Sequence, residues 1–237
     1  GERSGQAPVV RGHEVRRVRD GRACARGYRR PFVAVTFAMT VDGKITTKAF
    51  SPVDFTSRED KTHLFRQRSL GDAVLIGHST LKHDNVRLSL PDPKMREARI
   101  ARGQAPYPLR VIISNEGRID SSLKLFQTEI SPIVIFSTTR MPARYQKALR
   151  EKATLHLSDD RAVDLAWMLQ QLRRDYGVRS VACEGGATLF RALLEEAGVE
   201  DAAAGGPGSL FSLVATDGAV SVGSTFLTEE PEPAAWV

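Results

Sequence analysis

Residues 180–194 read SVACEGGATLFRALL, a short apolar run that passes through two glycines into a leucine-rich segment. The run at 180–183 predicts a buried strand. From residue 187 the apolar residues recur at helical spacing, and Gly198 is expected to close the resulting helix. The apolar face of this helix would be formed by Leu189, Phe190, Leu193 and Leu194. A strand, a tight glycine turn and a helix in this order form the repeating unit of α/β folds.

The same alternation extends toward the N-terminus. Short runs rich in β-branched or aromatic residues predict strands over 32–40, 73–76, 110–114 and 133–136. Helices are predicted from Ser57, a capping residue, to about residue 71, and over 164–176, where apolar residues share one face. Residues 85–108 contain four prolines and predict a long loop. This pattern predicts the α/β class, with a sheet covered by helices on both faces.

Composition divides the chain into three parts. Residues 1–30 hold nine arginines against three acids and few large apolar residues, which predicts a poorly ordered basic arm or linker. Residues 31–228 are predicted to form the folded domain. Its last part, residues 210–227, has room for two or three short strands. Residues 229–237 are acidic and predict a solvated tail.

Charge and composition exclude several classes of function. The 237 residues carry a net charge of +6, but no basic run is interleaved with aromatic residues, so nucleic-acid binding is not expected. No apolar run reaches 18 residues, so no membrane span is expected. Cys24 and Cys183 lie far apart, and the five histidines show no metal-ligand spacing, so neither a disulfide framework nor a metal is expected. We expect a cytoplasmic enzyme in which Cys183 is an inert buried thiol.

The turn at 184–189 is the strongest candidate for a binding site. Paired glycines allow a ligand to approach the backbone, and the free amides at the start of a helix attract an anion. The turn therefore predicts a phosphate or pyrophosphate site, although a tight strand-to-helix connection would also require small residues. Glu184 favours ligand binding, because an acid beside an anion site is expected to serve another part of the ligand.

A second turn of this kind, residues 77–80 (GHST), follows the strand at 73–76. It either touches the phosphates or ribose of a nucleotide or caps a short helix. Because neither a Walker sequence nor G-x-G-x-x-G occurs, the two turns suggest a nucleotide cofactor bound outside the usual fingerprint. Lys44 and Asp84 stand in shorter turns, where each is either a polar group of the site or a plain turn residue. All five histidines are expected to be structural or exposed.

Six motifs in order resemble a known family. They are AMTVDGKI at 38–45, TS at 56–57, DAVLIGHST at 72–80, DNVRL at 84–88, RVIIS at 110–114 and EGGATLFRALL at 184–194. In this order and spacing they resemble the reductase domain of the bacterial riboflavin-biosynthesis deaminase/reductase, over about residues 31–201. The resemblance implies a dihydrofolate-reductase-like fold, a three-layer sandwich around a central, mostly parallel sheet, and it implies a homodimer.

The resemblance also implies an activity, the NADPH-dependent reduction of the ribosyl group of 5-amino-6-(5-phosphoribosylamino)uracil to a ribityl chain. Matched position by position, and joined by Gly77 from the second turn, the NADPH site would comprise Ala38, Gly77, Thr80, Asp84, Ser114, Asn115, Gly185, Gly186, Ala187, Thr188 and Leu189. Arg68, Leu88 and Glu184 would meet the substrate. Lys44, Asp84 and Glu184 would be the catalytic groups nearest the reacting carbon, where a proton must reach the sugar ring oxygen.

The sequence departs from the family pattern at several positions. Pro91 replaces an arginine that helps to hold the substrate phosphate, and Val86 replaces a proline. Proline supplies no donor, so we expect Arg68 first and Arg87 second to bind the phosphate. The motifs of the zinc deaminase half are absent, so one reaction is expected. Two alternatives remain: a reductase of another pyrimidine or pterin, and a non-catalytic nucleotide-binding homologue.

Overall fold

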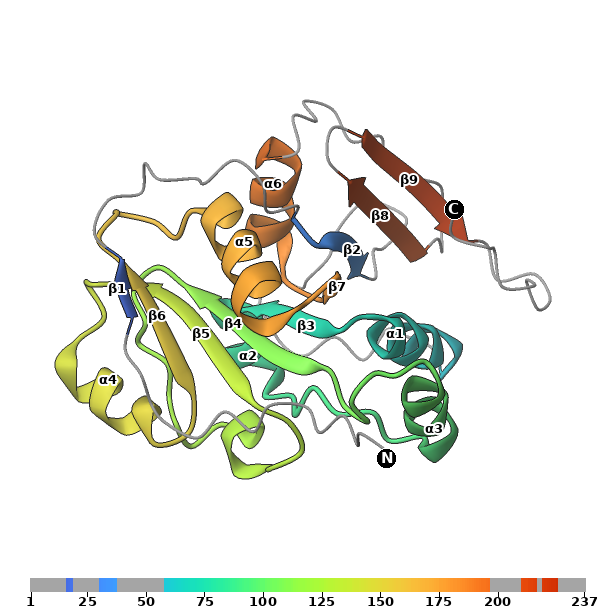
Figure 1. Cartoon of the computed structure of the whole chain (residues 1–237), viewed down its shortest axis with the longest axis horizontal. Coiled ribbons are helices and arrows are strands. Elements are labelled where there is room, and N and C mark those ends of the chain that lie inside the picture. The colour runs from blue at the N-terminus through green and yellow to red at the C-terminus, as the bar shows by residue number, and fades with distance from the viewer. Residues whose placement is uncertain (1–15, 19–29, 38–57, 197–209, 217–218, 226–237) are drawn as a thin grey trace, which may run out of the picture.

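The structure, a computed structural model, describes residues 16–18, 30–37, 58–196, 210–216 and 219–225. Strands and helices alternate along these residues (Figure 1). Ala38, Lys44 and the acidic tail at 229–237 lie outside the described residues.

The strands form one sheet. They are β1 (Arg16–Val18), β2 (Phe32–Phe37), β3 (Ala73–Gly77), β4 (Leu109–Ser114), β5 (Ile133–Thr138), β6 (Thr154–Ser158), β7 (Ser180–Cys183), β8 (Leu210–Thr216) and β9 (Ala219–Thr225). Their order across the sheet is β1-β6-β5-β4-β3-β7-β2-β8-β9. Every pair from β1 to β2 is parallel, and β8 and β9 add an antiparallel hairpin beside β2. The predicted mostly parallel central sheet is confirmed.

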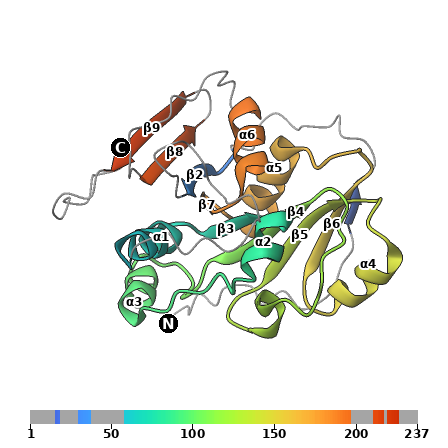
Figure 2. The ribbon, with the colours of Figure 1, turned by 180° about the vertical axis from the view of Figure 1, so that it is seen from behind.

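Helices cover both faces of the sheet. They are α1 (Arg58–Leu70), α2 (His78–Asp84), α3 (Pro93–Ala101), α4 (Ala143–Arg150), α5 (Leu165–Tyr176) and α6 (Ala187–Glu196), with a 3-10 turn at Lys124–Gln127. Helices α5 and α6 lie on one face, and α2 and α4 lie on the other, as the opposite views of Figures 1 and 2 show. The three-layer sandwich expected from the sequence is therefore confirmed.

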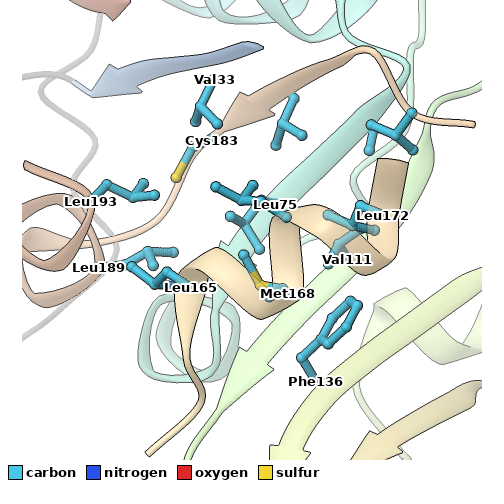
Figure 3. Packing of buried hydrophobic residues seen from close by; sticks show 14 of the residues in the cluster. Val33, Leu75, Val111, Phe136, Leu165, Met168, Leu172, Cys183, Leu189 and Leu193 are labelled. Carbon is cyan, nitrogen blue, oxygen red and sulfur yellow. The ribbon is translucent and has the colours of Figure 1, made fainter. Parts of the chain in front are cut away.

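Two apolar clusters hold these layers together, because successive side chains of a strand point to opposite faces. Leu75 and Val111 pack under α5, where Met168 and Leu172 cover them (Figure 3). Val74, Ile76 and Ile112 point the other way, toward α2 and α4. The central strands are thus buried on both sides, as their continuous apolar sequences require.

Several segments differ from the sequence prediction or refine it, and α4 and β6 lie in a stretch for which no element was predicted. Residues 93–101, inside the predicted loop at 85–108, form α3, because Asp92 accepts a hydrogen bond from the amide of Lys94 at 2.9 Å and Pro93 suits the first helical turn. Residues 16–18 of the predicted arm form β1, which pairs with β6. Residues 210–227 contain two strands, within the predicted two or three.

The strand order creates a topological switch point at the carboxyl edge of the sheet. Strands β3 and β7 are neighbours, but the chain continues from β3 to β4 on one side and from β7 to β8 beyond β2 on the other. Ligands of open α/β sheets bind at such a switch point, outside the carboxyl ends of the strands. The turns at 77–80 and 184–189 both stand at this edge.

Candidate functional site

The two turns predicted to bind a nucleotide lie against each other. A β-carbon added to Gly186 would lie 2.8 Å from Oγ1 of Thr80, and one added to Gly77 would lie 4.0 Å from Leu189. A β-carbon on Gly185 would lie 2.5 Å from Cδ2 of Leu189. The structure therefore brings these expected cofactor residues together, and it shows that glycine is needed at 186 for packing against the turn at 77–80 and at 185 for packing within the turn at 184–189.

The turn after β7 leads directly into the first amides of α6. The amide of Glu184 donates to the carbonyl of Leu75 at 2.8 Å, which extends the pairing of β7 with β3 by one residue. The first helical bond runs from the amide of Phe190 to the carbonyl of Gly186 at 3.1 Å. The amides of residues 187–189 precede this bond and have no partner within the helix. They form the donor set that a pyrophosphate requires.

Glu184 does not stand alone at the end of β7. Its two carboxylate oxygens accept hydrogen bonds from Nε and Nη2 of Arg68, each at 2.6 Å. The side chains of Arg68 and Glu184 are only 5% and 8% exposed. The structure thus joins two residues expected to bind the substrate, and local sequence spacing could not reveal their contact because they lie 116 positions apart.

The segment after α2 takes an unusual backbone path. Asn85 and Leu88 both have positive φ angles, 46° and 54°. Residues other than glycine rarely adopt positive φ angles, and those that do often lie at a functional site. The Leu88 side chain is 1% exposed and packs in the core, so it offers only its backbone to a substrate. Arg87 and Pro91, by contrast, are exposed.

The end of β4 adjoins the start of α2. Oγ of Ser114 lies 3.4 Å from Nδ1 of His78 and accepts a hydrogen bond from the amide of Gly117 at 3.1 Å. The Asn115 side-chain oxygen accepts from the amide of Val163 at 2.9 Å, so this oxygen is already engaged in the fold. The expected cofactor pair 114–115 therefore stands beside the turn at 77–80, where Ser114 approaches His78.

His78 is a candidate that sequence reasoning placed among the structural or exposed histidines. It is half-buried at the carboxyl edge, and burial, assisted by Lys82, lowers the pKa of its imidazole. A lowered pKa favours the neutral ring, which both donates and accepts hydrogen bonds. Its position directly after β3, inside the GHST turn, is the signal that could have identified it.

Asp84 is exposed to solvent, whereas Cys183 is buried. Asp84 ends α2 with its side chain open to solvent, yet partial desolvation raises the pKa of its carboxyl. Cys183 is fully buried, as expected, and burial raises the pKa of its thiol to about 12. No group of three potential metal ligands occurs among the described residues. Within the same residues, no helix is long and apolar enough to cross a membrane.

Comparison with known proteins identifies the family. The model of the RibD C-terminal domain matches residues 31–202. A relative from Archaeoglobus fulgidus, named 2,5-diamino-6-ribosylamino-4(3H)-pyrimidinone 5′-phosphate reductase, is 29% identical over 70% of this chain and 75% of its own length. A Saccharomyces cerevisiae protein of the same name is 25% identical over 83% of this chain and 73% of its own length.

Solved structures agree on the fold. A Thermotoga maritima diaminohydroxyphosphoribosylaminopyrimidine deaminase/5-amino-6-(5-phosphoribosylamino)uracil reductase superimposes with a TM-score of 0.55 at 24% identity. The match covers 70% of this chain and 42% of that protein, so this chain spans less than half of it. The expected dihydrofolate-reductase-like architecture is thereby confirmed. The chain belongs to the RibD C-terminal domain family, whose relatives named above are reductases, and it is an oxidoreductase.

Proposed function

We propose that this chain is an NADPH-dependent reductase that converts the ribosyl group of a ribosylaminopyrimidine 5′-phosphate to a ribityl chain in riboflavin biosynthesis. The observation that carries the proposal is the contact between the two turns, in which Gly186 lies against Thr80 at the carboxyl edge of the sheet. Family membership implies a nicotinamide cofactor. NADPH is the specific form that we propose.

The residues at this edge fit such a cofactor. The amides of 187–189 suit a pyrophosphate, and the glycines at 185 and 186 let the turn that presents these amides pack against Leu189 and Thr80. Thr80 supplies a hydroxyl group beside Gly186, and Ser114 supplies one beside His78 in the turn at 77–80. Leu189 is 7% exposed, so we assign its contribution to the backbone amide. Ala38, Gly77, Asp84 and Asn115 complete the proposed cofactor site.

The bound cofactor supplies a hydride to C1′ of the sugar, and the protein must handle a proton and position the ring. Opening of the sugar requires a proton at the ring oxygen. We propose Asp84 for this task, and partial desolvation raises the pKa of its carboxyl, the direction that favours a proton donor. Glu184, held by Arg68, is suited to orient the sugar rather than to exchange protons freely. Lys44 is the third proposed catalytic group.

Two substrates with different bases fit the proposal. The sequence resemblance favours the uracil compound, whereas the relatives from Archaeoglobus fulgidus and Saccharomyces cerevisiae are named for the 2,5-diaminopyrimidinone compound. The two differ at C2, which carries an oxygen in the first and an amino group in the second. Both have the same ribosylamino phosphate, so the groups proposed around the sugar serve either one.

The test is an NADPH-consumption assay with each of the two ribosylaminopyrimidine phosphates, with NADH in parallel. We expect turnover with at least one phosphate, and a higher kcat/KM with NADPH than with NADH. Turnover only with another pyrimidine or a pterin would support the first alternative. Tight NADPH binding with no turnover on any of these compounds would identify a non-catalytic homologue, and either result would contradict the proposal.

Two further expectations complete the proposed function. The resemblance supports a homodimer, which sedimentation of the purified chain would test. It also supports a cytoplasmic location, which fractionation of the source cells would test.

A further inference from the structure

Arg68 joins three segments that are distant in the sequence. It lies in the last turn of α1, and its guanidinium donates to both carboxylate oxygens of Glu184 after β7. Its Nη1 donates to the carbonyl of Ser89, in the segment between α2 and α3. Parallel hydrogen bonds to both oxygens of a carboxylate fix its orientation as well as its position. One side chain thus sets the relative placement of two parts of the candidate site.

The surroundings of Arg68 are unfavourable for binding a phosphate. The pair is buried, and Cζ of Arg68 lies 5.1 Å from the centre of the Phe65 ring. The charges of Arg68 and Glu184 cancel, so the pair offers little attraction to an anion. A phosphate that approached Arg68 would also come close to the Glu184 carboxylate, and two anions repel each other strongly at a buried position.

Arg87 has the opposite character. It is exposed, and it makes no salt bridge with any residue that the structure describes. It also belongs to the same segment as Ser89, whose carbonyl Arg68 links to Glu184. The positive charge of Arg87 can therefore attract a phosphate, whereas the charge of Arg68 is neutralised by Glu184.

The hydrogen bond to Ser89 falls at a strained point of the backbone. Leu88 has a φ of 54°, and the side chains of Leu88 and Leu90 are each 1% exposed. These two buried side chains anchor the segment on either side of Ser89. The bond from Arg68 fixes the carbonyl between them, so it helps to hold a conformation that a leucine would otherwise avoid.

We propose that Arg68 is a positioning residue, which holds the carboxylate of Glu184 and the backbone at Ser89 as one unit and does not bind the substrate phosphate. This inference rests on the proposed function for its kinetic consequence, and it replaces the expectation that Arg68 is the main phosphate ligand. Recognition of the phosphate passes to the exposed bases of the loop, with Arg87 first.

The kinetic test compares the phosphorylated substrate with its dephosphorylated analogue. Arg68→Lys keeps the charge but loses the two-point grip on the carboxylate. We expect kcat to fall about 10²-fold on both compounds, as misplacement of a reacting group does, with the ratio of their KM values unchanged. The matched control Arg87→Ala should raise KM for the phosphorylated compound only. A selective rise of that KM in Arg68→Lys would overturn the proposal.

A double-mutant cycle tests whether Arg68 acts through Glu184. In the Glu184→Gln background, Arg68→Lys should lower kcat much less than it does in the wild-type chain, because the group that it positions is already lost. Equal losses in both backgrounds would contradict a positioning role. Unchanged NADPH affinity and unchanged thermal unfolding of the double variant would verify that the comparison is made between folded proteins.

Hydrogen exchange supplies a readout that does not depend on activity. In Arg68→Lys, amides 86–90 and 184–186 should exchange faster, while amides of β5 keep their protection. Unchanged protection at 86–90 and 184–186 would overturn the inference. If the wild-type chain reduces neither pyrimidine, the proposed function fails, and the exchange result alone decides the role of Arg68.

Discussion

The two ends of the β3–β7 strand pair are held together in different ways. At the amino end, Asp72 accepts hydrogen bonds from the amides of Arg179 and Ser180 at 2.8 and 3.1 Å, and from Nε2 of Gln104 at 2.8 Å. Arg99, which is 1% exposed, donates to the carbonyls of Ser69 and Gly71. At the carboxyl end stand the two glycine turns and the Arg68–Glu184 pair.

This difference separates stability from function along one pair of strands. At the amino end the charged groups bind mostly backbone atoms, so their hydrogen-bonding capacity is consumed by the fold. Burial lowers the pKa of the Arg99 guanidinium to about 10, which still leaves it charged at neutral pH. At the carboxyl end a side chain pairs with a side chain, and the helix amides of 187–189 remain for a ligand. Substitutions at the two ends should therefore have different consequences.

The largest expected effect is on turnover, at Glu184. Glu184→Gln keeps the size of the side chain but removes the charge that Arg68 grips, so the group is no longer held for the sugar. We expect kcat to fall on the order of 10²-fold, or about 2.7 kcal/mol, with NADPH affinity retained. Steady-state kinetics and a fluorescence titration measure the two quantities.

The matched control is Asp72→Asn, the same exchange of carboxylate for amide at the other end. It should lower the free energy of unfolding by about 1–3 kcal/mol and leave kcat of the folded enzyme unchanged. If Glu184→Gln instead lost stability and cofactor binding together, the carboxyl end of the β3–β7 pair would be structural, like the amino end.

The next effect is on stability, at Gly71. A β-carbon there would lie 2.8 Å from the carbonyl of Ala73 and 2.9 Å from the amide of Ala182, and neither backbone atom can move aside cheaply. Gly71→Ala should lower the free energy of unfolding by about 1–3 kcal/mol in urea. Gly77→Ala is the control, because its β-carbon would meet nothing closer than 4.0 Å. Equal losses in the two variants would refute the contrast between the ends.

A smaller effect is expected on cofactor affinity, at Gly186. Gly186→Val places a side chain where the turn meets Thr80 and where the phosphates would approach the backbone. The dissociation constant for NADPH should rise at least tenfold, roughly 1.4 kcal/mol, and a parallel urea titration measures the stability lost to the contact with Thr80. If a titration of the variant gave the wild-type dissociation constant, NADPH would not bind at this turn.

The smallest effect concerns pH and His78. Because burial lowers the pKa of the folded imidazole below 6.5, this histidine contributes stability that is present above pH 6.5 and lost as the pH falls through the lowered value. His78→Gln should therefore lose less stability than the wild-type chain between neutral and mildly acidic pH. Parallel urea titrations across this range measure the difference, and identical slopes would show that His78 does not titrate with a lowered pKa.

Much of the fold could be predicted because its signals are local. The runs at 73–76 and 133–136 are apolar throughout, and residues 111–113 are apolar between Arg110 and Ser114, as expected of strands buried on both faces. The turns at 77–80 and 184–189 were expected at one edge, because the carboxyl ends of parallel strands share it, but their contact depends on β3 and β7 being neighbours, which the sequence did not indicate. Helix α3 escaped prediction because the prolines around it suggested a loop, although Asp92 followed by Pro93 is a helix start.

The site was less accessible to sequence reasoning because its decisive contacts are long-range. The Arg68–Glu184 pair depends on how α1 packs beside β7, which no spacing encodes. Leu88 shows a second cause: the resemblance identified its position, but the backbone there turns the side chain into the core. Residue identity alone could not indicate that orientation.

The burial of Cys183 offers a way to time the opening of the site. Its thiol lies on β7 between Val35 and Leu75 of the flanking strands, one residue before Glu184. With a pKa of about 12 and no exposed surface, it cannot react with an alkylating reagent until β7 separates from its neighbours. In a Cys24→Ser chain, the rate of alkylation of Cys183 would therefore measure how often β7 separates from its neighbours. A ligand bound across the two turns would lower this rate.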